Sequence, residues 1–408
     1  MEKATEVSER EGLMDILASG EKAKQIILAR LASDDAFWDD LEKSYGPRPR
    51  PVRRDDAEPK TSWTKMDRLA TPAQKAQAAG LLAAAAAWLE DEEEDEDDPE
   101  REALRYRKRW NYLWSQYFGS FEDTTIIPPM RYTDEPPIET IFPCHSLQVF
   151  SAKIAGIESG FRWPIDVFGL VAIRDSVDQN RNIIFQRSRV ECQTLTEKDP
   201  YLVLTGPTRA VVLSDSVTIE VYLKVKGPTE HEDETLCFLA EEILCSIPAH
   251  SSMLRRICTS KFSTLEFTLG HIIFSVEATI SVRVDDGSWP DGFHGQFSAC
   301  TNGEAVHPTS GTTSVNDKKI ILLSFGDEKV PVIGDGMIEL SRRVVSVPVN
   351  MKLEVSVKAW QDDSNAVEAV EEFTAKKADR SFGTLDIGYC KMDVIVAWSL
   401  ISNDPEPR

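Results

Sequence analysis

The sequence has 408 residues, of which 46 are Lys or Arg and 68 are Asp or Glu, so its formal net charge is -22. This length predicts two or three structural units with a substantial buried core. The acidic balance argues against a dedicated nucleic-acid binder, because such a protein needs a basic surface to displace counterions. The 41% hydrophobic share is ordinary for a globular protein.

The N-terminal part contains no apolar stretch long enough to cross a bilayer, which takes about 20 residues. The longest one, residues 81–89, consists mostly of alanine, and the first ten residues lack the apolar core of a signal peptide. We therefore expect no membrane association and a cytoplasmic or nuclear location. The seven cysteines include no C-x-x-C pair, which fits reduced thiols buried as small hydrophobic residues.

The first 145 residues read as a helical, partly disordered and acidic extension. Residues 1–45 repeat apolar side chains at helical spacing, and a proline-rich linker begins at residue 46. Thr71 and Pro72 resemble an N-cap and first helical position, and open an Ala-rich helix that runs to about residue 89. Residues 90–98 are nine consecutive acids, which repel one another and are expected to be solvated and disordered.

A basic and aromatic helix is predicted directly after the acidic tract, with Asp98 and Pro99 at its start. One face carries five apolar or aromatic residues, Tyr106, Trp110, Leu113, Trp114 and Tyr117, and several basic residues crowd the first turns. One interpretation is a surface for nucleic acid or a nuclear import signal. The other is an amphipathic helix docked on the next domain, with its bases neutralised by nearby acids.

Residues 146–400 read as a β domain, because β-branched or alternating runs are separated there by turn-rich segments. The expected strands lie at 146–154, 166–174, 182–185, 209–213, 217–226, 272–284, 319–325, 344–349, 352–360 and 391–398. A short helix is possible only around 235–244. The pattern favours an antiparallel sandwich or barrel over a βαβ fold.

An internal repeat suggests that this domain has two related halves, near 147–250 and 270–400. The first match is W-P-x4-G, formed by Trp163, Pro164 and Gly169 and again by Trp289, Pro290 and Gly295. Two further matches follow in the same order, around residues 209 and 342 and around residues 219 and 353. If the halves are duplicated, both tryptophans should occupy equivalent corners of the fold.

Recognised chemical motifs are missing. The sequence has no phosphate loop, dinucleotide fingerprint, zinc-protease helix or nucleophile elbow, so it predicts no catalytic residue, no cofactor and no metal site. Residues 178–182 imitate a calcium loop, but Ile183 replaces the required glycine and Arg189 the required glutamate, which indicates a polar hairpin turn. The six histidines show no ligand spacing. A C2-like membrane or calcium module would need clustered loop aspartates, and the β domain has only two adjacent pairs, Asp285 with Asp286 and Asp362 with Asp363.

Four longer strings resemble a known family. They are S-F-E-D-T-T-I-I-P-P-M at 120–130, V-A-I-R-D-S-V-D at 171–178, D-P-Y-L-V-L-T-G-P-T-R-A-V at 199–211 and G-S-W-P-D-G-F at 287–293. They are similar to an uncharacterised plant domain of unknown function that is abundant in cereal grasses. Some members resemble fusions to ribosome-inactivating N-glycosidase domains, so the resemblance implies a part in stress or defence.

The leading hypothesis is a non-catalytic, β-rich protein-interaction module whose acidic tract attracts basic proteins. The tract could equally be a solubilising spacer. The alternative is an enzyme that acts on an unknown small substrate at a site between the two halves. That alternative would gain support if Arg174, Asp175, His294 and Arg342 met in one concave site.

Overall fold

Three antiparallel sheets account for the β-rich part of the chain in a computed structural model. The structure describes residues 98–402, apart from 136–140, 159, 246–249, 304–313, 317, 327–329 and 362–365. The chain divides into two units, Met1–Glu93 and Glu94–Arg408. The expectations for residues 1–45, the proline-rich linker, the Ala-rich helix and the tract up to residue 97 lie outside the described residues.

The first sheet is five-stranded, with the order β3-β2-β6-β7 and β4 paired to β2. Its strands are β2 (Ile165–Arg174), β3 (Asn182–Arg187), β4 (Gln193–Leu195), β6 (Val217–Val225) and β7 (Glu234–Ile243), with the 3-10 helix η1 (Glu230–Glu232) before β7. The second sheet has the order β11-β10-β15-β16. Its strands are β10 (His294–Asn302), β11 (Ile320–Phe325), β15 (Lys352–Trp360) and β16 (Val367–Thr374).

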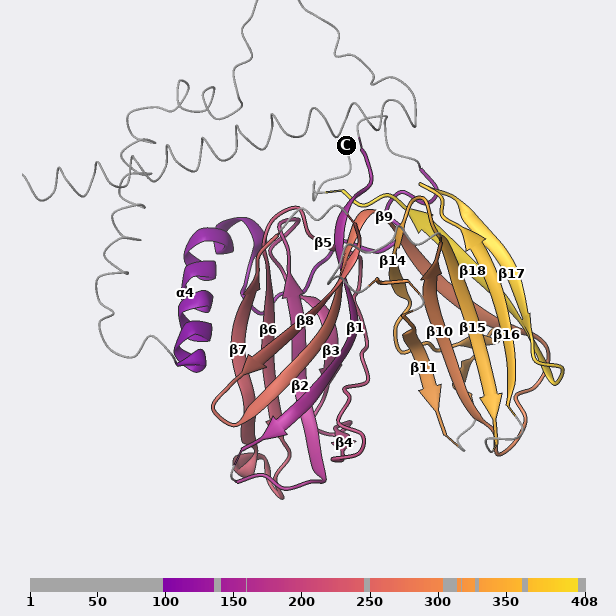
Figure 1. The fold of residues 1–408 in the computed structure, drawn as a ribbon. Helices are drawn as coiled ribbons and strands as arrows, with labels where there is room; N and C mark the ends of the chain where they lie inside the picture. The colour runs from indigo at the N-terminus through magenta and orange to yellow at the C-terminus, as the bar shows by residue number, and fades with distance from the viewer. Residues whose placement is uncertain are drawn as a thin grey trace, which may run out of the picture. The chain divides into compact units, whose positions relative to one another are not determined.

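The third sheet is nine-stranded and is built around one long strand, β9 (Ser263–Gly287). The other strands are β1 (Cys144–Ile157), β5 (Val211–Val212), β8 (Ser252–Thr259), β12 (Val332–Ile333), β13 (Met337–Ile338), β14 (Val344–Pro348), β17 (Arg380–Asp386) and β18 (Cys390–Ser399). The first part of β9 pairs with β1 and β8, and its second part pairs with β14 and β18 (Figure 1).

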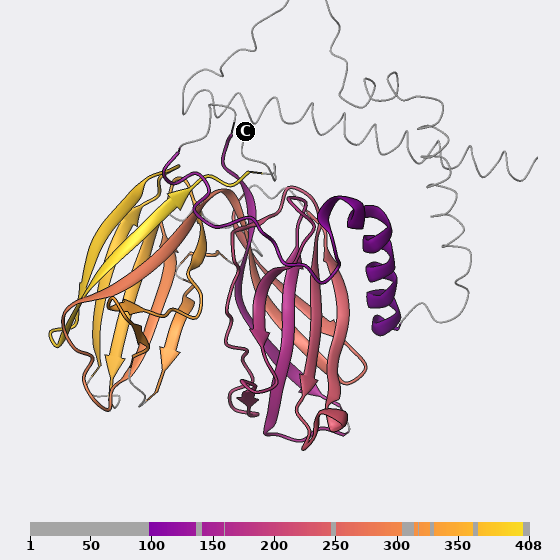
Figure 2. The same cartoon turned by 180° about the vertical axis from the view of Figure 1, so that it is seen from behind.

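Two hydrophobic cores follow from this arrangement. One core lies between the five-stranded sheet and the β1, β8 and first β9 strands, and includes Val171, Phe185 and Phe267. The other lies between the four-stranded sheet and the β14, β18 and second β9 segments, and includes Phe297 and Trp398. The two groups of strands can be followed from the opposite side in Figure 2. The expectation of a mainly β region, an antiparallel sandwich or barrel, is confirmed, with the strands arranged in three antiparallel sheets.

One secondary-structure expectation is wrong. The helix considered around 235–244 is strand β7, which pairs along its length with β6. Its Leu, Glu and Ala residues favour a helix in isolation, but Leu236 and Leu239 are buried in the first core. Burial and ladder hydrogen bonds therefore override the local propensity.

The two W-P-x4-G segments precede strands with the same place in their sheets. Trp163 precedes β2, which lies between β3 and β6, and Trp289 precedes β10, which lies between β11 and β15. In the hairpins β2–β3 and β10–β11 the register shifts after Val171 and after Phe297, which are 126 residues apart. Duplication stays a prediction, and this shared strand order supports it.

The pairing of the next strand differs between the two sheets. Val221 of β6 lies opposite Val171, whereas Val357 of β15 lies opposite Phe297. The sequence match around residues 219 and 353 instead aligns Val221 with Val355. The two alignments differ by two residues, which leaves every side chain on the same face of its strand.

The repeat residues pack closely in both sheets. Trp163 and Trp289 are half-buried against the first and second cores respectively. Gly169 has a φ of +118°, and a Cβ there would lie 2.2 Å from a backbone oxygen of β6. At Gly295, a Cβ would lie 2.1 Å from the Phe325 ring. Neither position has room for a side chain.

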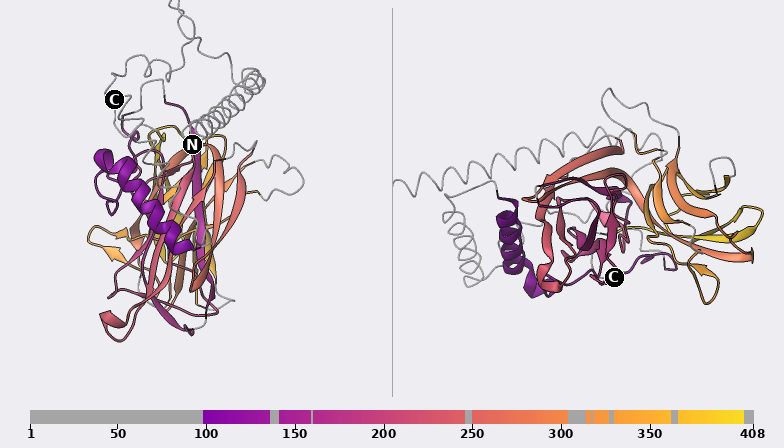
Figure 3. Two further views of the ribbon diagram at one scale, coloured as in Figure 1. Left: turned by 90° about the vertical axis from the view of Figure 1, so that its left-hand side faces the viewer. Right: turned by 90° about the horizontal axis from the view of Figure 1, so that it is seen from below.

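Helix α4 (Pro99–Phe118) lies alongside the first group of strands, next to β7 (Figure 3). Asp98 accepts a hydrogen bond from the Glu100 N–H at 3.0 Å, and Pro99 occupies the first turn. Both features are typical helix starts. Among the described residues, no helix has the length and apolar character needed to cross a bilayer.

Candidate functional site

Helix α4 docks on the five-stranded sheet through a narrow stripe of side chains. Ala103, Tyr106 and Trp110 are buried, and the Tyr106 and Trp110 rings pack with Phe121 and Ala240. The Trp110 Nε1–H donates a hydrogen bond to the backbone oxygen of residue 179 at 2.8 Å. The inner face of α4 therefore matches the interpretation of an amphipathic helix that is docked on the next domain.

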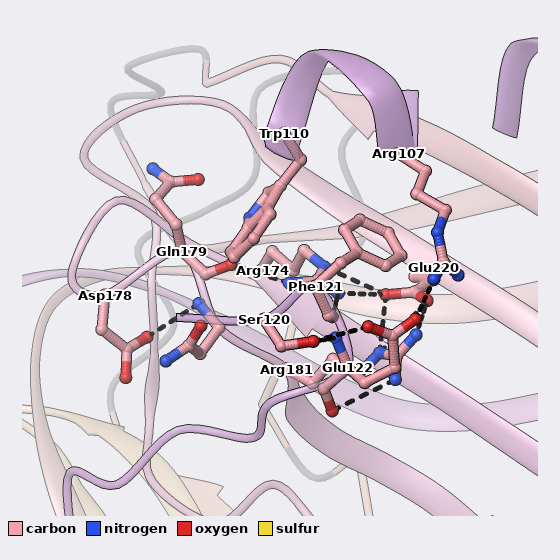
Figure 4. A network of polar contacts seen from close by, with 11 residues as sticks. Arg107, Trp110, Ser120, Phe121, Glu122, Arg174, Asp178, Gln179, Arg181 and Glu220 are labelled. Carbon is pink, nitrogen blue, oxygen red and sulfur yellow. Dashed lines mark hydrogen bonds and ion pairs between the residues drawn. The ribbon is translucent and has the colours of Figure 1, made fainter. Parts of the chain in front are cut away.

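A buried cluster of charged side chains lies beneath the helix (Figure 4). Glu220 of β6 accepts hydrogen bonds from Arg174 Nε and Nη2 at 2.9 and 2.8 Å, and from Arg181 Nε at 3.0 Å. Burial lowers the pKa of Arg174, although the Glu220 carboxylate counteracts this shift. Arginine remains protonated at neutral pH, so one carboxylate neutralises two guanidinium groups only in part.

The Phe121 ring lies among three guanidinium groups. The ring centroid is 4.0 Å from Arg174 Cζ, 4.9 Å from Arg107 Cζ and 5.2 Å from Arg181 Cζ. Such cation–π contacts are strongest where water is excluded, and Phe121 is buried. The ring thus joins the helix to the charged cluster.

The neighbouring Glu122 supplies a second carboxylate. It accepts a hydrogen bond from the Ser120 hydroxyl at 2.6 Å and forms an ion pair with Arg107. These contacts, the Ser120 hydrogen bond first, lower the pKa of Glu122. Its backbone oxygen accepts a hydrogen bond from Arg181 Nη1 at 3.2 Å. The segment after α4 is therefore tied to the helix and to the sheet.

A cavity of about 240 Å³ lies between α4 and the sheet. Its lining combines four aromatic rings, three charged side chains and three small or aliphatic residues. These are Tyr106, Phe121, Tyr222 and Phe238, then Arg107, Arg181 and Glu220, then Ala103, Leu239 and Ala240. Burial raises the pKa of Tyr106, although a side-chain hydrogen bond with Thr218 counteracts this shift, so its hydroxyl stays protonated at neutral pH. The cavity offers aromatic surface and charge together.

A second buried ion-pair cluster occupies the turn between β2 and β3. Arg209 Nη1 and Nη2 donate to the Asp175 carboxylate at 2.7 and 2.9 Å, and Nη2 also donates to Asp178 at 3.1 Å. Burial alone would lower the pKa of Arg209, but the two carboxylates raise it above its usual value. The residues that imitate a calcium loop thus form the expected hairpin turn, with Asp178 paired to an arginine. The described residues contain no group of three or more side chains placed to hold a metal ion.

A small cavity near this turn is lined by Arg209 and Glu277. Its volume is about 20 Å³, which suits a single water molecule. Burial raises the pKa of Glu277, although the backbone N–H groups of Ala210 and Met130 donate to it at 2.7 Å. This cavity has no room for a substrate.

The four residues whose convergence would have supported an enzyme have different surroundings. Arg174 pairs with Glu220, whereas the adjacent Asp175 pairs with Arg209. Arg342 donates to the backbone oxygens of residues 149, 150 and 321, and burial lowers its pKa to about 9. His294 stacks on the Trp360 ring with centroids 5.6 Å apart. The structure does not bring these residues into one concave site.

A histidine pair links β1 and β9. His145 Nδ1 and His271 Nε2 are 2.9 Å apart, so one nitrogen donates and the other accepts. Burial lowers the pKa of His145, and burial together with His145 lowers the pKa of His271 to about 4. The pair is therefore neutral at pH 7. Histidine spacing in the sequence gave no sign of it, because the two residues are 126 positions apart.

None of the seven cysteines forms a disulfide, and four are buried. Burial raises the pKa of Cys144 and Cys258 to about 12 and that of Cys237 to about 11. A thiol with such a pKa remains protonated and is a poor nucleophile. These cysteines act as packing residues.

The comparisons with known proteins give a family assignment. Residues 146–396 match the family described as "Domain of unknown function (DUF6598)". The chain belongs to this family. None of the curated proteins matches the sequence.

Solved structures show only distant similarity to this DUF6598 protein. Human GIVD cytosolic phospholipase A2 is 9% identical with a TM-score of 0.19, and the match covers 64% of this chain. The chain spans about a third of that protein, 33% of its length. The tandem C2 domains of calcium-bound Extended-Synaptotagmin 2 are 9% identical with a TM-score of 0.21, covering 65% of this chain and all of that one, 100%.

Proposed function

We propose that this DUF6598 protein is a non-catalytic interaction module that docks an acidic protein segment on the outer face of α4. This outer face consists of Leu104, Lys108, Arg109, Tyr112 and Leu113, all of them exposed. The observation that carries the proposal is this combination of exposed aromatic, aliphatic and basic side chains on a helix whose inner face is fixed.

The chemistry of the face favours a protein partner. Leu104 is 49% exposed, Leu113 44% and Tyr112 38%, so three large apolar or aromatic side chains are exposed within ten residues of one helix, and such gathered exposure is typical of interaction sites. Tyrosine and arginine are enriched in protein interfaces, where they combine apolar contact with hydrogen bonding. Lys108 and Arg109 add positive charge, so a partner with acidic and apolar side chains complements the face.

Because the inner face of α4 packs on the sheet, the outer face of the helix is ordered in the absence of a partner. Trp110 and Tyr106 hold α4 against the sheet, so binding need not order the helix. A preordered surface loses less conformational entropy on binding than a flexible one does.

Fluorescence anisotropy with a labelled peptide of alternating acidic residues, leucine and tyrosine tests the proposal. The pair of changes Lys108→Glu and Arg109→Glu should weaken binding at least tenfold, and binding to the unchanged protein should fall as salt rises. The matched control reverses two exposed lysines elsewhere, Lys198→Glu and Lys377→Glu. Equal loss in both pairs, or tighter binding of an RNA oligonucleotide than of the peptide, contradicts the proposal.

We also propose that the acidic tract at 90–98 binds basic proteins, which its nine acids and the net charge of -22 support. Poly-lysine beads provide the test. Replacing the tract by Gln and Asn leaves a net charge of about -13 and should reduce the salt-sensitive part of retention. Equal retention of both forms at low salt would reduce the tract to a spacer. The resemblance of the four sequence strings supports a place for the protein in plant stress or defence.

A further inference from the structure

We infer that the cavity beneath α4 binds a small aromatic anion. The cavity has a volume of about 240 Å³ and is lined from two sides. Tyr106 and Arg107 come from the helix, and Tyr222 and Phe238 come from β6 and β7. This site is separate from the outer face of α4 and does not depend on a protein partner.

The aromatic lining selects a flat ligand. On the helix side, Tyr106 and Phe121 have ring centroids 6.0 Å apart in an edge-to-face arrangement. On the sheet side, Tyr222 and Phe238 are 5.8 Å apart in the same arrangement. A ligand ring between these pairs can make edge and face contacts with each, which aromatic rings prefer.

The charges around the cavity select an anion. Three guanidinium groups, those of Arg107, Arg174 and Arg181, share two carboxylates, those of Glu122 and Glu220. The ion-pair cluster therefore carries one excess positive charge. Lys224 adds a further positive charge beside a lining residue, with its Nζ 6.0 Å from the centroid of the Tyr222 ring. A cationic ligand would meet repulsion here, although four aromatic rings would otherwise suit one.

The size of the cavity limits the ligand to one or two rings with a carboxylate. Arg107 is the best placed group to meet that carboxylate, because it lines the cavity and its side chain is 43% exposed. Its planar guanidinium can bind a carboxylate with two parallel hydrogen bonds. A bound ligand would touch α4 and the sheet at once and would hold the helix in its docked position.

Calorimetry of the full-length protein with 2-naphthoate tests the inference, and neutral 2-naphthamide and cationic naphthylmethylammonium serve as comparisons. The naphthoate should bind at least tenfold more tightly than either of the other compounds. It should also slow hydrogen exchange along α4 as its concentration rises above its dissociation constant, because it favours the docked state. Absence of binding by naphthoate and by the single-ring benzoate overturns the inference, as does equal binding of the three naphthyl compounds.

Three variants locate the binding. Ala240→Leu fills the cavity from β7 and should abolish naphthoate binding, while binding of the acidic peptide to the outer face of α4 stays unchanged. Arg107→Gln should weaken naphthoate binding about tenfold, and Arg101→Gln on the same helix should leave it unchanged. Should Ala240→Leu lose its circular dichroism signal, Tyr222→Ala removes one wall at an exposed position and should cause a similar loss. Unchanged naphthoate affinity in the folded cavity variants places the ligand elsewhere and overturns the inference.

Discussion

Replacement of Trp110 should release α4 from the sheet without unfolding the β domain. The Trp110 side chain is 1% exposed, and its ring lies 5.5 Å from the Phe121 ring and 5.1 Å from Arg174 Cζ. Truncation of a fully buried tryptophan to alanine costs about 3–5 kcal/mol. We therefore expect Trp110→Ala to make docking of α4 on the sheet less favourable by about that amount.

Trp110→Phe separates the hydrogen bond from the packing. It keeps most of the ring but removes the Nε1–H donor to the backbone oxygen of Gln179, which still accepts from Arg174 Nη1 at 2.9 Å. A lost hydrogen bond of this kind costs about 0.5–1.5 kcal/mol, and the smaller ring adds a little more. This variant should thus destabilise docking by about 1–2 kcal/mol.

Hydrogen exchange of the α4 amides is the direct assay. A loss of about 3 kcal/mol corresponds to roughly a hundredfold faster exchange, since about 1.4 kcal/mol is tenfold. Tyr117→Ala, on an exposed side chain of the same helix, should change docking by less than about 0.5 kcal/mol. Unchanged α4 exchange in Trp110→Ala, or equal effects of the Phe and Ala variants, would refute the reasoning.

Two further predictions concern the β domain. His271 has a pKa of about 6.5 in the unfolded chain and of about 4 in the folded protein. As the pH falls from about 6.5 to about 4, protonation therefore favours the unfolded chain, and the free energy of unfolding should decrease by roughly 3 kcal/mol. Denaturant titrations of His271→Gln should show a flatter pH dependence, and the same change at exposed His231 should not. Trp163→Ala and Trp289→Ala should each cost about 2–3 kcal/mol, less than a fully buried tryptophan because both are half-buried. Thermal unfolding tests this, and a cost below about 0.5 kcal/mol at one of them would speak against equivalent corners.

Strand positions were largely predictable because the β-branched runs carry a local signal. The range 352–360 coincides with β15, and 217–226 exceeds β6 by one residue. The signal failed at β7, where Leu, Ala and Glu favour a helix until the sheet buries one face. It also missed β8, β16 and β17 among the longer strands; exposed Arg255 in β8 and Glu372 in β16 interrupt the apolar runs.

The charged clusters could not be predicted from the sequence. Arg174 follows three apolar residues and Glu220 sits within a valine-rich run, so each could be suspected of burial. Their pairing depends on the register of β2 with β6, across 46 positions of chain. Phe121 joins them from an irregular segment with no periodic pattern. Only the completed fold brings these three residues together.

The continuity of β9 determines how the protein can be divided. Its residues 263–272 pair with β1 and residues 275–287 pair with β14 and β18, so both cores share one strand. A recombinant fragment that ends before β9 would expose the paired edges of β1 and β8, and such open edges promote aggregation. A fragment that starts at residue 270 would begin inside the strand. Truncation studies of this family should therefore keep residues 263–287 intact in every fragment.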